Sequence, residues 1–387
     1  MSESKKVYIL KQRLDNYGGL EKYTYRIAEA FAKKGCDVTL LSGDEMKKFH
    51  NHPHFDFKTF PVPKYFSLRR VEHFDTNVRR YLKKQDFDVV FGLDRTRFQT
   101  HIRAGNGVHR VFLKRRKSTS SLLRRMSLPI NPLHRLILSI EKQAFEHPKL
   151  QCLFTNSNMV KNEILSYYKV DEKKIHVVHN GVEWNDMQKD FDTWLEKKAK
   201  VASSLHLDPA DYHFLFIGND YRRKGLDVLL QAFSMIKNKD IHLSVVGKDK
   251  NMKAFITQAD KLGISKNVSF YGSQSDVRKF YQLSDCLIIP SFYDPFANVT
   301  IEALAMGLYV ISSPYNGGHE ILSKETGTTL ETLKDPACLA KAMEDAISTP
   351  KTWIHATSIR NSVKHLDFSN QIGNLIDISL SFTDSDE

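Results

Sequence analysis

The sequence predicts an α/β protein with two Rossmann-like domains, each built on a doubly wound parallel sheet. Its 387 residues, at about 150 residues per domain, are enough for two domains with substantial cores. Short apolar segments alternate with segments of helical periodicity, which is typical of strands in a parallel sheet covered by helices. This alternation stops near the middle of the chain and then begins again, which indicates a second domain of the same class.

The first domain is expected to begin with a buried strand over residues 6–10, followed by a loop and a helix. Apolar side chains between Leu20 and Phe31 keep helical spacing, and Gly35 ends that helix. Further strands of this domain are expected over residues 36–43, 86–93 and 151–157.

The second domain is expected to follow a join near residues 179–182, where a strand ends in a turn. Residues 184–205 are interpreted as a polar or helical linker. Strands of this domain are expected over residues 212–218, 241–247, 267–272, 286–291 and 309–313. The predicted boundaries are 1–183 for the N-terminal domain, 184–365 for the C-terminal domain and 366–387 for a C-terminal helical segment.

Composition excludes several classes of protein. Hydrophobic residues make up 41% and charged residues 26% of the chain, close to the averages of globular proteins, so disordered, collagen-like and coiled-coil proteins are excluded. The four cysteines lie too far apart for a CxxC motif, which favours reduced thiols and a cytoplasmic location. We expect neither a signal peptide nor a membrane-spanning segment.

Positive charge is concentrated in one segment. The formal net charge is +12, and residues 95–140 contain eleven Lys and Arg side chains and no acidic one. Apolar residues are interleaved with these cations, a mixture that favours binding to an anionic membrane surface. A solvated basic loop and a nucleic-acid site are the alternatives, and no aromatic stacking platform supports the latter. The predicted membrane-binding residues are Lys114, Arg115, Arg116, Lys117, Arg124 and Arg125.

Two loops have the features of phosphate-binding turns. Gly18 and Gly19 follow a predicted strand and precede a helix, where free backbone amides attract anions. In the second domain, Gly218 ends a predicted strand, and the basic run Arg222-Arg223-Lys224 precedes a helix. Cations at that position could neutralise the charge that develops on a departing pyrophosphate. A simple turn and a solvated charged loop are the alternative interpretations.

The segment 286–313 carries two acidic residues with different roles. Asp294 precedes a proline in a predicted loop, close to the backbone amides of Phe296, Ala297 and Asn298, which could bind sugar hydroxyls or phosphate. Glu302 lies in the helix that follows, among apolar neighbours, where a vicinal ribose diol would satisfy both of its oxygens. The next turn, residues 317–320, is a weaker phosphate-binding candidate.

Together these motifs resemble those of the retaining family-4 glycosyltransferases of GT-B fold. The motifs are GGL from residue 18, HNGV at 179–182, RRKG at 222–225 and DPFANVTIEALAMGLYVI at 294–311. Their order and spacing cover most of the chain. Within that family the chain is most similar to enzymes that add glucose to heptose in the bacterial lipopolysaccharide core.

The resemblance implies a GT-B architecture of two Rossmann-like domains that face each other across a cleft. The N-terminal domain would receive an acceptor at the membrane, the C-terminal domain would bind the nucleotide sugar, and the C-terminal helix would return to the N-terminal domain. Donor contacts are then expected from Gly18, Gly19, Gly218, Arg223, Lys224, Asp294, Phe296, Ala297, Asn298, Val299 and Glu302. Asp294, Arg223, Lys224, His109 and Asn106 are expected at the reacting groups.

One position departs from the family pattern. Asn106 stands where an acidic residue is expected, and an amide cannot act as a general base. In retaining transfer by this family the departing phosphate is usually described as the group that takes the acceptor proton, so activity does not require that acid. His109 is the alternative proton acceptor, and a structural histidine is the other interpretation.

Two Asp-x-Asp strings are excluded as metal-binding sugar-nucleotide motifs. Asp86 and Asp88 lead into a predicted strand, and Asp190 and Asp192 lie in the predicted linker. Neither pair is expected near a donor. We expect no metal and no cofactor besides the co-substrate.

The function implied by the resemblance is retaining transfer of a hexose, with UDP-glucose as the favoured donor, to a lipid-linked saccharide acceptor. The acceptor would be a lipopolysaccharide core heptose or a related glycolipid, at the anionic inner-membrane surface facing the cytoplasm. No nucleic-acid partner is expected. The alternatives are a family-4 enzyme with another donor or acceptor, and a non-catalytic GT-B protein at the membrane surface.

Overall fold

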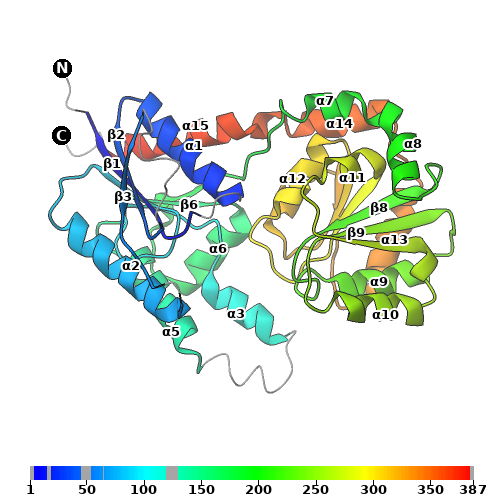
Figure 1. The fold of residues 1–387 in the computed structure, drawn as a ribbon, viewed down its shortest axis with the longest axis horizontal. Coiled ribbons are helices and arrows are strands. Elements are labelled where there is room, and N and C mark those ends of the chain that lie inside the picture. The colour runs from blue at the N-terminus through cyan, green and yellow to red at the C-terminus, as the bar shows by residue number, and fades with distance from the viewer. Residues whose placement is uncertain (1–3, 15–18, 45–53, 64, 119–129, 384–387) are drawn as a thin grey trace. The chain divides into compact units, whose positions relative to one another are not determined.

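The computed structural model describes residues 4–14, 19–44, 54–63, 65–118 and 130–383. The chain forms two compact units (Figure 1). Unit 1 comprises Met1–His179 and Ser369–Glu387, and unit 2 comprises Asn180–Phe368. Both units are α/β, each with its own parallel sheet, which confirms the predicted fold class.

The described part of unit 1 contains a seven-stranded parallel sheet in the order β3-β2-β1-β4-β5-β6-β7. Its strands are β1 (Lys6–Lys11), β2 (Asp37–Ser42), β3 (Asp56–Thr59), β4 (Val89–Gly92), β5 (His101–Arg103), β6 (Cys152–Thr155) and β7 (Ile175–Val177). Val7 is in register with Val38 of β2 on one side and with Val89 of β4 on the other. The strand order therefore reverses at β1, as in doubly wound folds.

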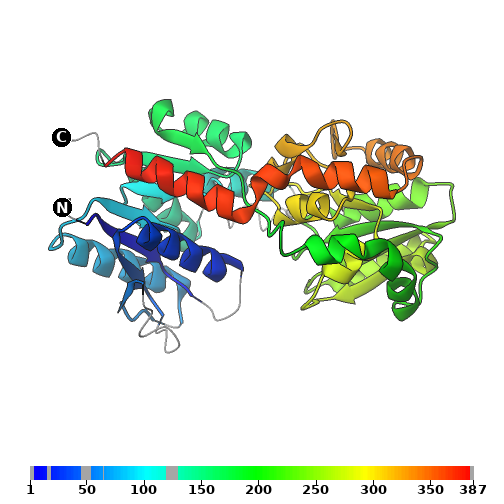
Figure 2. The same ribbon diagram turned by 90° about the horizontal axis from the view of Figure 1, so that it is seen from above.

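Helices cover the sheet of unit 1 (Figures 1 and 2). They are α1 (Gly19–Lys33), α2 (Ser67–Leu82), α3 (His109–Ser118), α5 (Pro132–Phe145), α6 (Asn158–Tyr167) and α15 (Phe368–Ser381), with a 3-10 turn η1 (Glu172–Lys174). Local sequence fixes where some begin: Pro132 occupies the first turn of α5, and the Asn131 side chain accepts a hydrogen bond from the Leu133 amide at 2.9 Å. Helix α15 joins unit 1 from the far end of the chain, where the Ser379 carbonyl lies 3.1 Å from His101 Nε2.

The described strands of unit 2 form a six-stranded parallel sheet in the order β10-β9-β8-β11-β12-β13. They are β8 (Tyr212–Ile217), β9 (Ile241–Val246), β10 (Val268–Gly272), β11 (Cys286–Ile289), β12 (Tyr309–Ser312) and β13 (Gly327–Thr329). The helices are α7 (Gln188–Asp192), α8 (Trp194–Ser204), α9 (Leu226–Met235), α10 (Met252–Lys261), α11 (Arg278–Leu283), α12 (Asn298–Ala305), α13 (Pro336–Ile347) and α14 (Trp353–Ser362). Three 3-10 turns complete it: η2 (Ser265–Asn267), η3 (Gly317–Ile321) and η4 (Lys364–Leu366).

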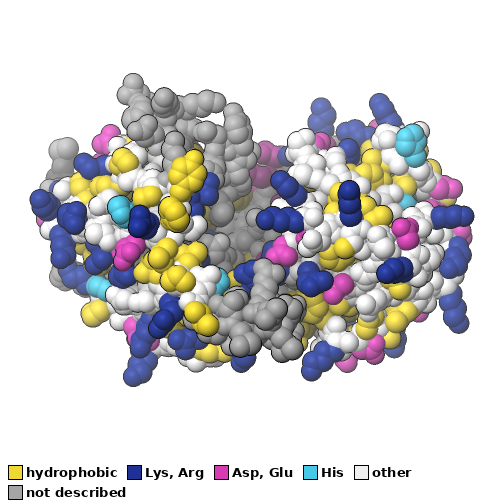
Figure 3. Space-filling model, turned by 60° about the horizontal axis from the view of Figure 1, so that its bottom comes forward, with side chains coloured by type: hydrophobic (Ala, Val, Ile, Leu, Met, Phe, Trp, Pro, Cys, Tyr) yellow, Lys and Arg dark blue, Asp and Glu magenta, His cyan; other side chains and the backbone are white. Residues whose placement is uncertain are grey.

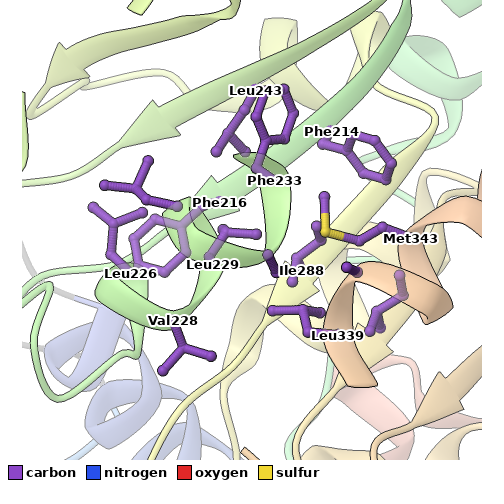
Figure 4. Packing of buried hydrophobic residues seen from close by; sticks show 14 of the residues in the cluster. Phe214, Phe216, Leu226, Val228, Leu229, Phe233, Leu243, Ile288, Leu339 and Met343 are labelled. Carbon is purple, nitrogen blue, oxygen red and sulfur yellow. The ribbon is translucent and has the colours of Figure 1, made fainter. Parts of the chain in front are cut away.

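Hydrophobic cores lie on both faces of this sheet. Side chains alternate along a strand, so Phe214 and Phe216 belong to one core and Leu215 to the other. Figure 4 shows the first core, in which Phe233 of α9 and Met343 of α13 pack against strand residues. A sheet covered on both faces explains why these strands read as continuous apolar runs in the sequence.

The prediction of a linker over residues 184–205 is wrong. Within this segment α7 and α8 are integral parts of unit 2, and Phe191 and Trp194 are 2% and 1% exposed in its second core. The Lys351 ammonium lies 4.3 Å from the centre of the Trp194 ring. The many charged residues around these two aromatic residues made the segment look like an exposed linker, although α7 and α8 are each buried on one side.

The chain passes between the units twice, and the two segments next to these crossings are hydrogen-bonded to each other. Val182 pairs with Asp367, through hydrogen bonds from the Val182 amide to the Leu366 carbonyl (3.0 Å) and from the Phe368 amide to the Val182 carbonyl (2.8 Å). The unit boundaries accordingly follow His179 and Phe368, whereas residues 183 and 365 were predicted. None of the helices in the described part of the chain combines the length and hydrophobicity needed to cross a bilayer.

Candidate active site

The candidate site of unit 2 lies where the order of its strands reverses. Strand β8 pairs with β9 on one side and with β11 on the other, so the loops that follow β8 and β11 lie at the switch point of the sheet. Ligands of doubly wound sheets bind at this point, beyond the carboxyl ends of the strands. The predicted basic run follows β8, and Asp294 follows β11.

The loop after β8 is held in a tight turn. Tyr221 is fully buried, its amide donates a hydrogen bond to the Asp249 carboxylate (2.7 Å), and its hydroxyl donates to the Gly247 carbonyl (2.8 Å). Gly225 has a φ of +78°, and a Cβ there would lie 1.9 Å from the Pro290 carbonyl oxygen. Only glycine allows this close approach of the two loops. The basic side chains in this turn are thereby brought against the loop that follows β11.

Asp294 is surrounded by two cations. Its carboxylate lies 2.5 Å from the Lys224 ammonium and 3.7 Å from Arg223 Nη1. Arg223 Nη1 also donates a hydrogen bond to the Tyr293 carbonyl at 3.1 Å. Gly218 lies beneath Lys224, since a Cβ at Gly218 would be 3.1 Å from Lys224 Cγ. The structure therefore brings together four of the predicted donor residues. Arg223 Nε also lies 3.4 Å from the Asp220 carboxylate, so the two cations contact two carboxylates.

Asn316 organises the rest of the loop. It is fully buried, its Oδ1 accepts hydrogen bonds from the amides of Ala297 (2.9 Å) and Gly318 (3.2 Å), and its Nδ2 donates to Thr300 Oγ1 (3.1 Å) and Ser312 Oγ (3.0 Å). The Ala297 amide, predicted as a possible ligand contact, is thus paired within the protein. The reason is structural: a buried amide side chain must satisfy its own hydrogen-bonding groups.

The first turn of α12 presents two amides that have no hydrogen-bond partner among the described residues. Asn298 and Val299 occupy its first two positions, where an N–H group has no acceptor within the helix. The Asn298 side chain accepts a hydrogen bond from Asn180 Nδ2 at 2.6 Å. Phe296 is buried in the second core just before this turn. Backbone amides that face outward from a helix start are suited to oxyanions.

Glu302 is held by Tyr281. The carboxylate is half-buried on α12, and its Oε2 accepts a hydrogen bond from the Tyr281 hydroxyl at 2.8 Å. Burial raises the pKa of Glu302, while the Tyr281 hydrogen bond and the positive charge of Arg278 act in the opposite direction. The expectation that a ribose diol satisfies both oxygens is corrected, because the protein itself uses one. Among the described residues Oε1 has no hydrogen-bond partner.

In unit 1, His109 belongs to a buried polar network. It begins α3, its amide donates a hydrogen bond to Glu141 Oε2 (2.9 Å), and its Nε2 lies 3.1 Å from Nδ1 of His134. Glu141 is 2% exposed and also meets Arg95 at 3.5 Å. Burial, with added repulsion from Arg95 and His134, lowers the pKa of His109 to about 3. Its imidazole is therefore neutral near pH 7.

Asn106 is exposed in the loop between β5 and α3. It lies at the edge of a small cavity of about 30 Å³ that Arg95 and Glu141 also line. Two carboxylates line this cavity as well, Asp94 and, from α5, Glu141. Sequence reasoning missed Glu141 because it and Asn106 lie 35 positions apart in the chain.

Several other predicted residues need only be placed. Gly19 begins α1. Gly18, Arg124 and Arg125 lie outside the described residues, and the side chain of Lys117 is not described. Lys114, Arg115 and Arg116 lie on α3, with Lys114 Nζ 3.4 Å from the Tyr167 hydroxyl and Arg116 over the Phe112 ring at 5.6 Å.

The two Asp-x-Asp strings make structural contacts. The Asp88 carboxylate accepts a hydrogen bond from the Lys6 amide at 2.7 Å, and Asp190 pairs with Arg278 at 2.8 Å. Within the described ranges, no three His, Cys, Asp or Glu side chains are grouped so that they could hold a metal ion.

Sequence reasoning also missed Asn316 and Tyr281. Asn316 directly precedes the Gly317-Gly318 pair, and an Asn-Gly-Gly string is a turn signal, but nothing local shows that its side chain is buried. Tyr281 lies on α11, 21 residues before the glutamate that it contacts. Only the tertiary fold brings these residues to the site.

Comparison with known protein families separates the chain into two matched regions. A model described as Glycosyltransferase Family 4 matches residues 17–185, and one described as Glycosyl transferases group 1 matches residues 197–364. The chain belongs to the family-4 glycosyltransferases of GT-B fold. Together the two models span nearly all of both units.

Solved structures share this fold over nearly the whole chain. WaaG, a glycosyltransferase involved in lipopolysaccharide biosynthesis, has a TM-score of 0.76 at 20% identity, and covers 96% of this chain and 99% of its own. Anabaena HepE, solved in complex with UDP, has a TM-score of 0.69 at 16% identity, with 97% and 99% covered.

Curated relatives of this glycosyltransferase differ in how much they share. The lipopolysaccharide glucosyltransferase WaaG of Escherichia coli is 23% identical over 326 residues, 81% of this chain and 82% of that protein. An uncharacterized glycosyltransferase of Methanocaldococcus jannaschii is 27% identical, with 55% and 54% covered. A D-inositol 3-phosphate glycosyltransferase of a Mycobacterium species is 31% identical, with 43% and 37% covered. The chain thus spans about half or less of the length of the latter two relatives.

Proposed function

We propose that this glycosyltransferase moves glucose from UDP-glucose, with retention of anomeric configuration, to a heptose of a lipopolysaccharide core or a related glycolipid. The observation that carries the proposal is the group formed by Lys224, Arg223 and Asp294 at the switch point of unit 2. The choice of sugar and acceptor is supported by the names of relatives: WaaG is a lipopolysaccharide glucosyltransferase, and HepE was solved with UDP-glucose.

The donor diphosphate would lie against Lys224 and Arg223. Asp294 contacts both cations, and Asp220 lies 3.4 Å from Arg223 Nε, so a diphosphate would bind the two cations by replacing part of these ion pairs. The free amides of Asn298 and Val299 add hydrogen-bond donors for phosphate oxygens. These fixed charges would stabilise the departing phosphate as the glycosidic bond breaks, and they supply the neutralisation for which other transferases use a metal ion.

The nucleoside would be held by Glu302. Its Oε1 is free to accept hydrogen bonds from ribose hydroxyls, and the hydrogen bond from Tyr281 to Oε2 fixes the orientation of the carboxylate. A carboxylate acceptor gives stronger hydrogen bonds than an amide of the same shape, which is a reason for an ionised group at a half-buried position.

Transfer would proceed on one face of the sugar. The bond between C1 and the phosphate oxygen breaks, the acceptor oxygen forms a bond to C1, and the acceptor proton moves to the departing phosphate. A His109 pKa of about 3 makes its imidazole a weak base near pH 7, which favours phosphate as the proton acceptor. In this proposal Asn106 and His109 contact the acceptor and do not carry the proton.

The acceptor would be reached at an anionic membrane surface on the cytoplasmic face of the inner membrane. Support comes from α3, which carries Lys114, Arg115 and Arg116 within ten residues and no acidic residue. Cations close to an anionic leaflet gain about 1 kcal/mol each.

Turnover with a panel of nucleotide sugars and acceptors tests the proposal. We expect product only with UDP-glucose and a heptose-containing acceptor, and a loss of at least a hundredfold in turnover for Lys224→Met. Lys341→Met, at an exposed position of α13, is the matched control and should retain the activity of the natural chain. Product with inositol 3-phosphate as acceptor would instead favour the reaction for which the mycobacterial relative is named. A folded chain that binds no donor would favour a non-catalytic protein.

A further inference from the structure

Unit 1 contains a second cavity, which lies away from the carboxyl ends of its strands. It has a volume of about 790 Å³ and lies between α2, α5 and the segments that precede β4, β5 and β6. Because these segments precede strands, the cavity opens at the amino edge of the sheet, whereas doubly wound folds bind their substrates at the carboxyl edge. Its volume is within the range of small-molecule sites.

One wall of this amino-edge cavity is aromatic. Phe87 and Phe98 pack with ring centres 5.6 Å apart, and Phe98 packs edge-on against His147 at 5.3 Å. Leu82 extends the wall and is itself buried. Burial, with repulsion from Lys149, lowers the pKa of His147, so this ring is also uncharged near pH 7. The wall thus offers a continuous apolar surface that remains half-buried in an open cavity.

Cations make up most of the remaining lining, beside Gln85, Gln143 and Pro148. Arg79, Arg97, Lys83, Lys142 and Lys149 line the cavity, and the acidic residues among or beneath them are Glu146 and Asp75. That is an excess of three positive charges.

These cations differ in their partners. Arg79 and Arg97 share the buried carboxylate of Asp75, which is 0% exposed, so one carboxylate serves two guanidinium groups. Lys83 and Lys149 are exposed and form no ion pair with any described residue. Figure 3, which brings the side of α2 and α5 toward the viewer, shows hydrophobic side chains on unit 1 with Lys and Arg side chains around them.

We propose that this amino-edge cavity binds a phosphorylated amphiphile, a small molecule whose apolar part lies on the Phe87 and Phe98 wall and whose phosphate is held by Lys83 and Lys149. An uncharged apolar ligand would leave the lysines without a counter-charge. Inorganic phosphate would leave the aromatic wall exposed to water. A ligand that has both parts uses both features, and it does not depend on the donor site proposed for unit 2.

Two sources of such a ligand share this chemistry, a single-chain lipid phosphate and a nucleotide. Calorimetric titration of the full-length chain with dodecyl phosphate below its micelle concentration tests the first, and titration with AMP tests the second. Inorganic phosphate and the uncharged dodecyl maltoside serve as the two half-ligands. AMP is also expected at the donor site, so the number of nucleotides bound per chain is counted.

The variant Lys83→Gln/Lys149→Gln removes the unpaired cations. We expect it to weaken dodecyl phosphate binding at least tenfold, or to remove one of two bound AMP molecules, and either result supports the proposal and names the source. Lys84→Gln/Lys173→Gln, at exposed lysines outside the cavity, is the matched control and should bind like the natural chain. Phe98→Leu tests the wall by itself, and its binding of dodecyl phosphate should also weaken.

Three results would overturn the proposal. They are equal binding of dodecyl phosphate and inorganic phosphate, equal binding of dodecyl phosphate and dodecyl maltoside, and no difference between the natural chain and both cavity variants for either probe. Melting temperatures show that each variant is folded. Sugar-transfer activity of the double variant should be unchanged, so failure here and failure of the proposed function can be told apart.

Discussion

The Lys224 ammonium lies 2.5 Å from the Asp294 carboxylate, although 70 residues separate the two in the chain. Both follow neighbouring strands of one parallel sheet, and each side chain is 12% exposed. A pair this sheltered is held by the fold, and Arg223 lies beside it, 3.7 Å from Asp294 and 3.4 Å from Asp220. We interpret this group of charged side chains as preorganised to bind a diphosphate in unit 2.

Asp294→Asn should therefore lower kcat by about a hundredfold, the usual effect of losing one preorganised charge at a reacting group. The amide would still accept a hydrogen bond, but the positions of Lys224 and Arg223 would no longer be fixed by a charge. Steady-state kinetics with the donor and acceptor measure the effect. Asp345→Asn, at an exposed position of α13, should leave kcat unchanged; an equal fall in both variants would contradict the interpretation.

Tyr281→Phe should shift the pH dependence of donor binding. The Tyr281 hydroxyl stabilises the ionised Glu302, so its removal raises further a pKa that burial already raises. In the proposed function the ionised form of Glu302 accepts the ribose hydroxyls. This form is lost as pH falls through that pKa, and in the variant it should be lost at a higher pH.

Donor dissociation constants measured between pH 4.5 and 8 show the position of this transition. Tyr309→Phe is the matched control, because the Tyr309 hydroxyl also forms a hydrogen bond in unit 2, with Thr328 Oγ1 at 2.7 Å. The same profile for Tyr281→Phe and the natural chain would show that Glu302 does not bind the donor in its ionised form.

Asn316→Ala should reduce the free energy of unfolding of unit 2 by about 2–4 kcal/mol, because it leaves two amides and two hydroxyl groups without their buried partner. Asn316→Asp keeps the acceptor oxygen and should recover part of that loss. Urea unfolding gives the values, with the exposed Asn361→Ala for comparison. A loss below 0.5 kcal/mol for Asn316→Ala would mean that water replaces these hydrogen bonds.

His109 should make the chain less stable in acid. Its folded pKa of about 3 lies below the ordinary value of 6.5, so between these pH values the unfolded chain binds a proton that the folded chain does not. Stability then falls as pH decreases below 6.5, with a slope of up to about 1.4 kcal/mol per pH unit from this group.

His109→Gln should flatten that dependence, as measured by urea unfolding between pH 4 and 7.5. His355→Gln, in unit 2, provides the comparison. Parallel curves for His109→Gln and the natural chain would show that the pKa of His109 is the same in the folded and unfolded states, and would restore it as a candidate proton carrier.

The triple variant Lys114→Gln/Arg115→Gln/Arg116→Gln should bind vesicles of anionic lipid at least tenfold more weakly, since each cation contributes about 1 kcal/mol near such a surface. Cosedimentation of the natural chain should also weaken between 50 and about 500 mM salt, where the Debye length becomes short. Binding that does not change with salt would overturn the electrostatic account of α3.

The strands that could be predicted are mostly those with an apolar run of their own. Strands such as β1 and β8 consist of six residues, almost all buried, and their apolar runs are visible in the sequence. Strands β3, β5 and β13 were missed because they have only three or four residues and carry polar side chains. Strand β5 contains the buried His101 and Arg103. Their polar groups find partners in other parts of the chain, which a local sequence pattern cannot show.

The site divides in the same way. Lys224 and Asp294 could be placed together from sequence, because the carboxyl ends of neighbouring parallel strands share one edge of the sheet. The roles of Asn316, Tyr281 and Glu141 could not, because each depends on a buried side chain whose partner lies at least 19 residues away in the chain. Residue types with chemical function are visible in a sequence, whereas the groups that position them are set by packing.

The central claim is tested most directly by the product formed from UDP-glucose and a deacylated, heptose-containing lipopolysaccharide core acceptor, identified by NMR. The account predicts an α-linked glucoside with the natural chain and with Lys341→Met, and at least a hundredfold slower formation with Lys224→Met. A β-linked product, or equal rates for Lys224→Met and the natural chain, would contradict it.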